Sequence, residues 1–192
     1  MTETRPITPV VDTLPPAADV LRLATAYQAS RALYVATRMG LPDLLAGKPG
    51  SVENLAGATG SHEPSLRRLL RTLAAFGVFS ETGDGRFELG PLGACLRTDA
   101  PGSLRGLVLM WGDSDFWQTW GELEYCVRTG RTAAEHLFGA DDAFRRYATD
   151  ARFGAVFNAG MTVLSSTTAA AVIGAYDFSG FVRVVDVLSL IH

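Results

Sequence analysis

The fold is predicted most clearly by residues 51–89, SVENLAGATGSHEPSLRRLLRTLAAFGVFSETGDGRFEL. Ser51 is a suitable N-cap and Gly60 a suitable end for one short helix. Apolar residues at helical spacing predict a second helix from His62 to Phe76. The Asp84-Gly85 pair predicts a tight turn within a hairpin over residues 78–89. Helix, helix and hairpin in this order are typical of a winged-helix unit.

Before this unit stands a long predicted helix, preceded by a Pro-rich arm over residues 1–16. Ala17 to Arg38 carries apolar residues on two sides, with Val20, Leu23 and Tyr27 on one of them. A helix that is apolar on more than one side has to be covered on more than one side. We therefore expect a partner subunit to pack against it.

After the unit, the sequence predicts a series of helices. The predicted ranges are 91–97, 104–111, 116–128, 133–138, 141–148 and a long helix capped by Asp150 that ends near Gly174. The β-branched run from Val182 to Val187 predicts a buried parallel strand. Only five residues follow it, too few for the ~30 residues of a βαβ unit. We expect the chain to begin a doubly wound domain without building it.

Composition sets limits on function. The chain has 192 residues, 47% hydrophobic and 19% charged, with a formal net charge of −3. An acidic chain has no general attraction to phosphate backbones, which disfavours nucleic acid as a partner. Three arginines on the second helix of the winged-helix unit offer a DNA-binding face; the alternative is a solvated face paired with nearby acids. These residues are Arg67, Arg68 and Arg71, and the acids are Glu53, Glu63 and Glu81.

The scarce cysteines and histidines predict neither a disulfide framework nor a metal site. Cys95 and Cys126 lie far apart, and the three histidines show no metal-ligand spacing. The N-terminus lacks the apolar run of a signal peptide, and no uninterrupted apolar stretch approaches the ~18 residues of a membrane span. We expect a soluble cytoplasmic protein without a membrane partner.

Aromatic residues gather at two places. Trp111, Phe116, Trp117 and Trp120 fall close together, and the long predicted helix carries Phe153, Phe157 and Met161 at four-residue spacing. That spacing drifts by only ~40° per step, so the three residues form one stripe that continues to Ser165. From the residues alone, both groups fit helix packing as well as a pocket for flat organic molecules.

A family resemblance favours the pocket. The segment ARFGAVFNAGM, residues 151–161, resembles a signature of the plant-type O-methyltransferases and their bacterial polyketide-tailoring relatives, which use S-adenosylmethionine. The segments 109–113 and 116–130 resemble the preceding helices of that family, and 51–89 resembles its winged-helix module. The resemblance covers residues 17–187.

The resemblance implies a fold and a partner. In this family the N-terminal module forms homodimers, and its first helices interleave with those of the partner. We therefore expect a mainly α chain with a flexible arm (1–16), a winged-helix dimerisation domain (17–99), a helical acceptor-pocket and linker region (100–180), and the truncated start of a Rossmann-like cofactor domain (181–192).

It also implies site residues. Positions that line the phenolic or polycyclic acceptor in the family match Met110, Trp111, Ala143, Tyr147, Phe153, Phe157 and Met161. Ser165 and Asp186 match positions close to the cofactor. In the implied reaction, a base removes the proton of the acceptor hydroxyl and the oxygen attacks the sulfonium methyl group in line.

The sequence departs from the family after Val187. A strand of this kind continues into a Gly-x-Gly loop in the family, whereas Leu188-Ser-Leu-Ile-His192 follows here and no glycine occurs after Gly180. The family's basic histidine has no match either, so we predict no catalytic residue. We expect this chain to lack the cofactor loop, not to bind the cofactor alone and to be inactive alone, with a separate chain as a candidate for the missing half.

Two other functions stay open at this stage. One is a non-enzymatic dimerising or ligand-binding module that keeps the aromatic pocket. The other is a winged-helix DNA-binding regulator.

Overall fold

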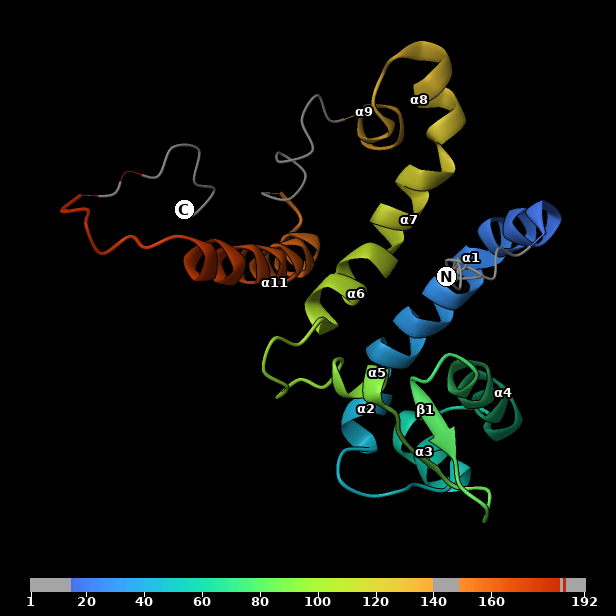
Figure 1. The fold of residues 1–192 in the computed structure, drawn as a ribbon. Helices are drawn as coiled ribbons and strands as arrows, with labels where there is room; N and C mark the ends of the chain where they lie inside the picture. Colours follow the sequence, from blue (N-terminus) through green and yellow to red (C-terminus); the bar gives the residue numbers. More distant parts are fainter. Residues whose placement is uncertain (1–14, 140–148, 184, 186–192) are drawn as a thin grey trace, which may run out of the picture.

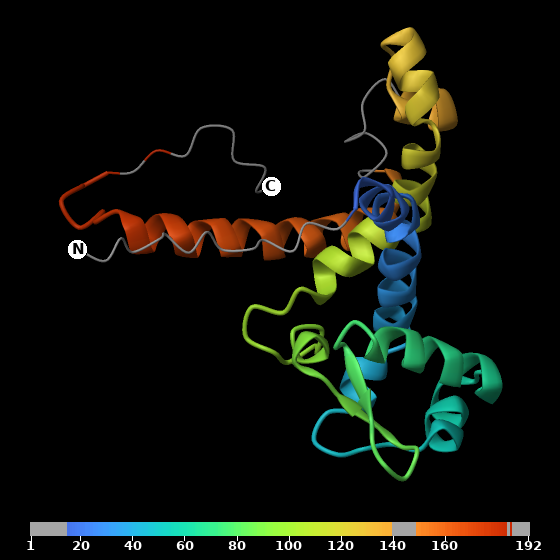
Figure 2. The same cartoon turned by 45° about the vertical axis from the view of Figure 1, so that its right-hand side comes forward.

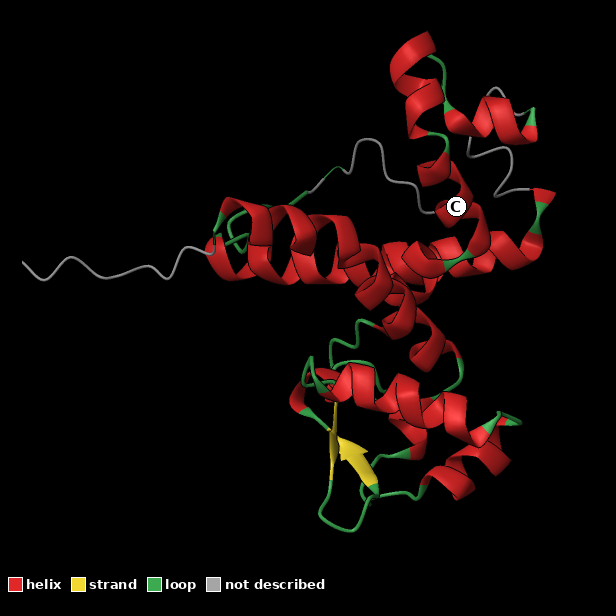
Figure 3. Cartoon of the chain, turned by 90° about the vertical axis from the view of Figure 1, so that its right-hand side faces the viewer, coloured by secondary structure: helices red, strands yellow, loops and turns green. Residues whose placement is uncertain are grey.

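The structure, a computed structural model, describes residues 15–139, 149–183 and 185. These residues are mostly helical, with one two-stranded sheet (Figures 1 and 3). The helices are α1 (Pro16–Arg38), α2 (Leu41–Leu44), α3 (Val52–Thr59), α4 (Glu63–Ala74), α5 (Pro91–Ala94), α6 (Arg105–Gly112), α7 (Ser114–Gly121), α8 (Leu123–Thr129), α9 (Ala133–Phe138) and α11 (Ala151–Ala175). The strands are β1 (Phe79–Glu81) and β2 (Phe87–Leu89).

Residues 51–89 fold in the predicted order of helix, helix and hairpin. Ser51 caps α3 by accepting a hydrogen bond from the backbone N–H of Asn54, and Gly60 ends the helix at a φ of 63°. A positive φ favours glycine, because a Cβ atom is strained there. Strands β1 and β2 pair antiparallel, with Phe79 opposite Leu89, and the bridge from Gly50 to Phe87 extends the pairing.

One apolar core holds α1 to α5 and the hairpin together. It contains the C-terminal end of α1, the inner faces of α3 and α4, and the two strand phenylalanines; its fully buried members include Ala36, Leu41, Val52, Leu70 and Phe87. Burying a large apolar side chain contributes about 1.5–3 kcal/mol. This unit therefore closes most of its apolar surface within itself.

The N-terminal half of α1 has no such cover. Val20, Leu21, Leu23 and Tyr27 are all more than half exposed, whereas the buried residues of α1 lie at Tyr34, Ala36 and Thr37. This agrees with the expectation of a helix that is apolar on more than one side.

Helix α6 joins this unit to α11. It packs against α1 on one side and α11 on the other, and α11 then extends away from the unit around the hairpin (Figures 1 and 2). A Cβ atom at Gly106 of α6 would lie 2.8 Å from the Ala159 carbonyl oxygen, so glycine permits this close crossing. By length and mean hydropathy alone α11 also fits a membrane span, a test that core helices of soluble proteins pass as well.

Two predicted helices differ from the structure. The helix predicted over 116–128 is two helices, α7 and α8, separated at Glu122, next to Gly121 with its low helix propensity. The helix predicted over 91–97 ends at Ala94, with Cys95 as its C-cap. The helix predicted over 141–148 lies outside the described residues.

The strand predicted over 182–187 is not formed at the described positions of that range. Phe181 to Arg183 and Val185 are not in a strand, and the remaining positions of the run lie outside the described residues. A strand requires a neighbour to accept and donate its ladder hydrogen bonds. Within the described ranges no strand is paired with this segment; the only sheet there is the hairpin of β1 and β2.

Candidate acceptor-binding site

An aromatic contact marks the place where α7 meets the start of α11. The rings of Phe116 and Phe153 lie with centroids 5.6 Å apart and are tilted by 54°. Tilted aromatic pairs at this distance contribute about 0.5–1.5 kcal/mol beyond their buried area. Phe153 is buried, and it is the first member of the predicted stripe.

Met110 fixes the distance between α6 and α11. Its side chain is buried and lies over Gly160, where an added Cβ atom would be 2.5 Å from Met110 Sδ. The thioether therefore occupies the space that a larger residue at 160 would need. Packing therefore explains Gly160 of the signature segment, because the Met110 side chain fills the space beside its Cα atom.

An ion pair ties the same elements together. Arg152 Nη1 donates to Asp113 Oδ2 at 2.8 Å, and Asp113 Oδ1 accepts the backbone N–H of Asp115 at the start of α7. Asp113 is only 5% exposed. Burial raises the pKa of Asp113, but the hydrogen bonds from Arg152 and from the Asp115 N–H outweigh it, and the pKa lies below its ordinary value.

A cavity of about 600 Å³ opens beside this ion pair, between α1, α6 and α11. Its charged and aromatic lining consists of Arg31, Arg38, Arg105, Arg152, Asp113 and Tyr34. Arg31 Nη1 donates to the Gly112 carbonyl oxygen at 2.6 Å, and its guanidinium lies over the rings of Tyr34 and Trp117. The cavity wall is thus built from residues far apart in the sequence.

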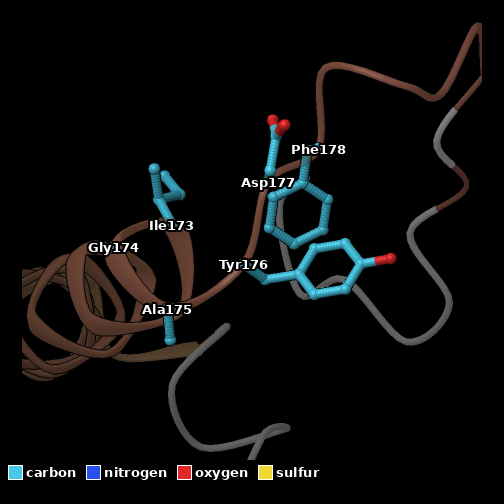
Figure 4. A pocket seen from close by; sticks show the side chains of 6 residues that line it. All are labelled: Ile173, Gly174, Ala175, Tyr176, Asp177 and Phe178. Carbon is cyan, nitrogen blue, oxygen red and sulfur yellow. The ribbon is translucent and has the colours of Figure 1, made fainter.

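A second hollow, of about 740 Å³, lies at the end of α11 (Figure 4). Ile173 projects beside it from the last turn of the helix, and the rings of Tyr176 and Phe178 meet edge to face, with centroids 4.8 Å apart and planes inclined by 64°. It is wide open, and its lining comes from residues 173–178 alone. A hollow lined by one short segment provides less enclosure for a ligand than the cavity beside α6.

The predicted site residues fall into three groups. Met110 and Phe153 are buried where α6 and α11 pack, and Phe157 and Met161 continue the stripe as half-buried residues. Trp111 is 54% exposed, and Ser165 is also exposed. Ala143, Tyr147 and Asp186 lie outside the described residues.

Sequence reasoning missed the polar half of this site. Asp113 lies between the helices predicted over 104–111 and 116–128, and the sequence assigns no site role to it or to Arg31, Arg38 and Arg152. The one available signal was the Gly-Asp-Ser-Asp run at 112–115, where an aspartate directly before a helix is a typical N-cap. Its partner at position 152 could not be inferred from spacing.

Two of the three arginines of α4 have acidic partners. Arg67 lies within 4.0 Å of Glu53, Glu63 and Glu81, and Arg71 lies 3.4 Å from Glu81. The solvated, paired face is therefore what the structure shows for these two residues. Among the residues that the structure describes, no cluster of three or more potential metal ligands occurs.

Two sequence families match the chain. The O-methyltransferase dimerisation domain matches residues 21–99, and the O-methyltransferase domain matches residues 120–188. The first range contains the core around Leu70, and the second contains the aromatic stripe of α11.

Curated relatives agree with these matches. The chain is 39% identical over 168 residues to the phenazine O-methyltransferase PhzM of Lysobacter antibioticus, a match that covers 88% of this chain and 49% of the relative. It is 37% identical to the O-demethylpuromycin-O-methyltransferase of Streptomyces alboniger, with 88% of this chain and 45% of the relative covered. The chain thus spans about half the length of the curated relatives it matches.

A solved structure supports the fold. The crystal structure of LaPhzM superposes with a TM-score of 0.82 at 39% identity and covers 88% of this chain and 50% of that one.

Proposed function

Because the chain belongs to the family of O-methyltransferases with an N-terminal dimerisation domain, we propose that it takes part in S-adenosylmethionine-dependent methyl transfer to a hydroxyl group of a small aromatic molecule. Its own contribution is the dimerisation domain, which we assign to the winged-helix type, and one wall of the acceptor pocket. We assign the cofactor loop of the family to the part of the relatives that these residues do not span.

One observation carries this proposal. The segment that resembles the family signature, residues 151–161, is held against α6 and α7 by Met110, Gly160 and the Phe116–Phe153 contact. Phe157 and Met161 continue along the same helix and are only half-buried, so part of their surface is available to a ligand. We assign Met110, Trp111, Phe153, Phe157 and Met161 to the acceptor wall, with Ala143 and Tyr147 as further members outside the described residues.

The described residues do not make a site for S-adenosylmethionine. Ser165 offers one exposed hydroxyl on α11, and Asp186, the other residue assigned to the cofactor, lies outside them. One exposed hydroxyl cannot hold a ligand with a sulfonium, a ribose and a carboxylate. We therefore derive no catalytic step through the cofactor and propose that the 192-residue chain does not bind it alone.

The exposed half of α1 favours a homodimer. Leu21, Leu23 and Tyr27 belong to the range that matches a dimerisation domain, and a second copy would cover them. We likewise propose that protein, not lipid, covers α11, and that the chain works in the cytoplasm, because the relatives it matches are enzymes acting on small molecules.

A non-enzymatic ligand-binding module is the second candidate, and it is favoured because, among the described residues, Ser165 is the one residue assigned to the cofactor. A DNA-binding regulator is not favoured, because Arg67 and Arg71 already lie against carboxylates. Cofactor binding distinguishes the first two candidates. An enzyme completed by another polypeptide gains S-adenosylmethionine binding and methyl transfer on mixing, whereas a non-enzymatic module binds only the aromatic ligand.

The acceptor wall is tested by titrating the chain with 2-naphthol, a flat phenolic probe, and following tryptophan fluorescence. Phe157→Ala is expected to weaken binding by about three- to tenfold, the loss of one aromatic contact. Val172→Ala, further along the same helix and exposed, is the matched control and is expected to leave binding unchanged. Equal effects of the two variants, or no binding of 2-naphthol at all, would contradict the assignment of these residues to the acceptor wall.

S-adenosylmethionine is the second titrant, and clear binding to the chain alone would contradict the assignment of the cofactor loop.

A further inference from the structure

The cavity between α1, α6 and α11 is unusually rich in arginine for an acidic chain. Four guanidinium groups line it, from Arg31, Arg38, Arg105 and Arg152, against the single carboxylate of Asp113. The chain as a whole carries a formal net charge of −3. Positive charge is therefore concentrated here against the overall balance of the molecule.

Two of the four arginines already have acidic partners. Arg152 pairs with Asp113 at 2.8 Å, and Arg105 Nη1 lies 4.0 Å from Asp43 while donating to the Thr37 carbonyl oxygen. These contacts fix the two side chains as part of the wall. Within the part of the chain that the structure describes, Arg31 and Arg38 are the two lining arginines without an ion pair.

Arg31 and Arg38 have no carboxylate within 4.0 Å among the residues that the structure describes. Their guanidinium carbons lie 4.7 and 6.0 Å from the centroid of one ring, that of Tyr34. Among the residues in the described ranges, each donates one hydrogen bond, Arg31 to the Gly112 carbonyl oxygen and Arg38 to the Tyr34 hydroxyl. A guanidinium has five N–H donors, so most of theirs remain available to a ligand.

We propose that this cavity binds a small organic acid through its carboxylate, with Arg31 and Arg38 as the anion-binding residues. Guanidinium groups match a carboxylate in shape and can donate two parallel hydrogen bonds to it. Leu109 and Val156, which also line the cavity, provide apolar surface for the body of the ligand. Two like charges beside one ring repel each other, and a bound carboxylate relieves that repulsion.

The size of the cavity fits this class of ligand. Its volume of about 600 Å³ falls within the ~300–1,000 Å³ that is typical of small-molecule sites. The proposal goes beyond methyl transfer, because it concerns binding by described residues and needs no cofactor. Its test therefore contains none, and its failure would leave the proposed function untouched.

The experiment compares two ligands of the same shape by calorimetric titration of the full chain. 2-Naphthoate carries the carboxylate, and 2-naphthamide replaces it with a neutral amide. We expect the carboxylate to bind at least about tenfold more tightly than the amide, because a charge-assisted hydrogen bond is stronger than a neutral one. Its affinity is expected to fall as salt is added. Equal affinity for the two ligands, or no binding of either, would overturn the proposal.

Arg38→Gln is the decisive variant, because Arg38 is exposed and its hydrogen bond among the described residues is to the Tyr34 hydroxyl. We expect it to weaken 2-naphthoate binding by about tenfold and to leave 2-naphthamide unchanged. Arg22→Gln removes the same charge from the same helix, about 24 Å away along its axis, and is the matched control. Arg38→Lys is expected to restore part of the affinity.

Two further results would contradict the assignment. One is an equal loss of 2-naphthoate affinity in Arg38→Gln and Arg22→Gln, which would show that the effect comes from the net charge of the chain and not from this cavity. The other is binding of inorganic phosphate without binding of 2-naphthoate at the same ionic strength, which would make this a phosphate site. Circular dichroism of each variant checks that the helices are intact.

Discussion

The core around Leu70 and the C-terminal half of α11 are both rich in apolar residues, yet they use them in opposite ways. Leu70 and Phe87 are 0% exposed, and the helices and hairpin around them cover each other. On α11, Ile173 is 69% exposed and Val172 is 48% exposed, and the helix runs clear of the core (Figure 2).

The difference in exposure separates the region around Leu70, whose apolar residues are covered, from the C-terminal half of α11, whose apolar residues form an exposed surface. The first region reaches a closed core with its own residues, as expected of a unit that folds by itself. The second exposes a contiguous run of apolar side chains, which in soluble proteins marks a surface for another protein segment or a ligand. The two family matches, residues 21–99 and 120–188, follow the same division.

The largest contrast is expected from truncating one side chain in each region. Leu70→Ala should lower the free energy of unfolding by about 2–5 kcal/mol, because it leaves a cavity in the closed core. Ile173→Ala should change it by less than about 0.5 kcal/mol, as for other exposed positions. Urea unfolding followed by circular dichroism measures both. Similar losses in the two variants would show that α11 is part of the core.

The next effect concerns the contact between α6 and α11. Gly160→Ala places a methyl group against Met110 and should cost about 1–3 kcal/mol of unfolding free energy through overpacking. Gly174→Ala, on the same helix with open space around it, should instead stabilise the chain by about 0.5–1 kcal/mol. If Gly160→Ala is also stabilising, Met110 does not set the distance between the helices.

A smaller effect is expected from Asp113→Asn, which keeps the shape and removes the charge paired with Arg152. The loss should be about 1–2 kcal/mol near neutral pH, the scale of a charge-assisted hydrogen bond. The folded-state pKa of Asp113 lies below its ordinary value of 3.8. Its stabilising contribution is therefore present above that value and is lost as the pH falls through the folded-state pKa.

The measurement for this variant is unfolding free energy as a function of pH. The difference between the natural chain and Asp113→Asn should be constant above about pH 5 and should shrink below pH 4. A difference that stays the same down to pH 2 would mean that the ion pair contributes nothing through its charge.

The smallest effect is expected on the surface of the closed region. Arg67→Gln removes a charge that faces three carboxylates, yet its side chain is more than a third exposed. Exposed pairs of this kind contribute about 0–1 kcal/mol, and added salt should remove the difference. A loss above about 2 kcal/mol would show that this network is structural rather than a solvated face.

Local signals predicted much of the first region. The cap at Ser51, the end of α3 at Gly60 and the tight turn at Asp84-Gly85 depend on neighbours within a few residues, so the sequence reveals them. The stripe of α11 was likewise visible as a spacing. The break at Glu122 between α7 and α8 was not foreseen, although Gly121 next to it weakens the helix.

The polar part of the site could not be predicted for a physical reason. Arg152 meets Asp113 across 39 positions, and Arg31 meets the Gly112 carbonyl across 81. Such contacts depend on how helices cross, and no periodicity along the chain records that. The strand predicted over 182–187 is absent at the described positions 182, 183 and 185 for the same reason, because β-branched residues form a strand only where another strand pairs with them.

Amide hydrogen exchange of the full chain tests the contrast between the two regions most directly. The account predicts that amides of α4 exchange roughly a hundredfold or more slowly than amides of the C-terminal half of α11, because only the former are sealed in a closed core. Equal protection along α4 and along residues 163–175 would contradict it, since α11 would then be as firmly covered as the core.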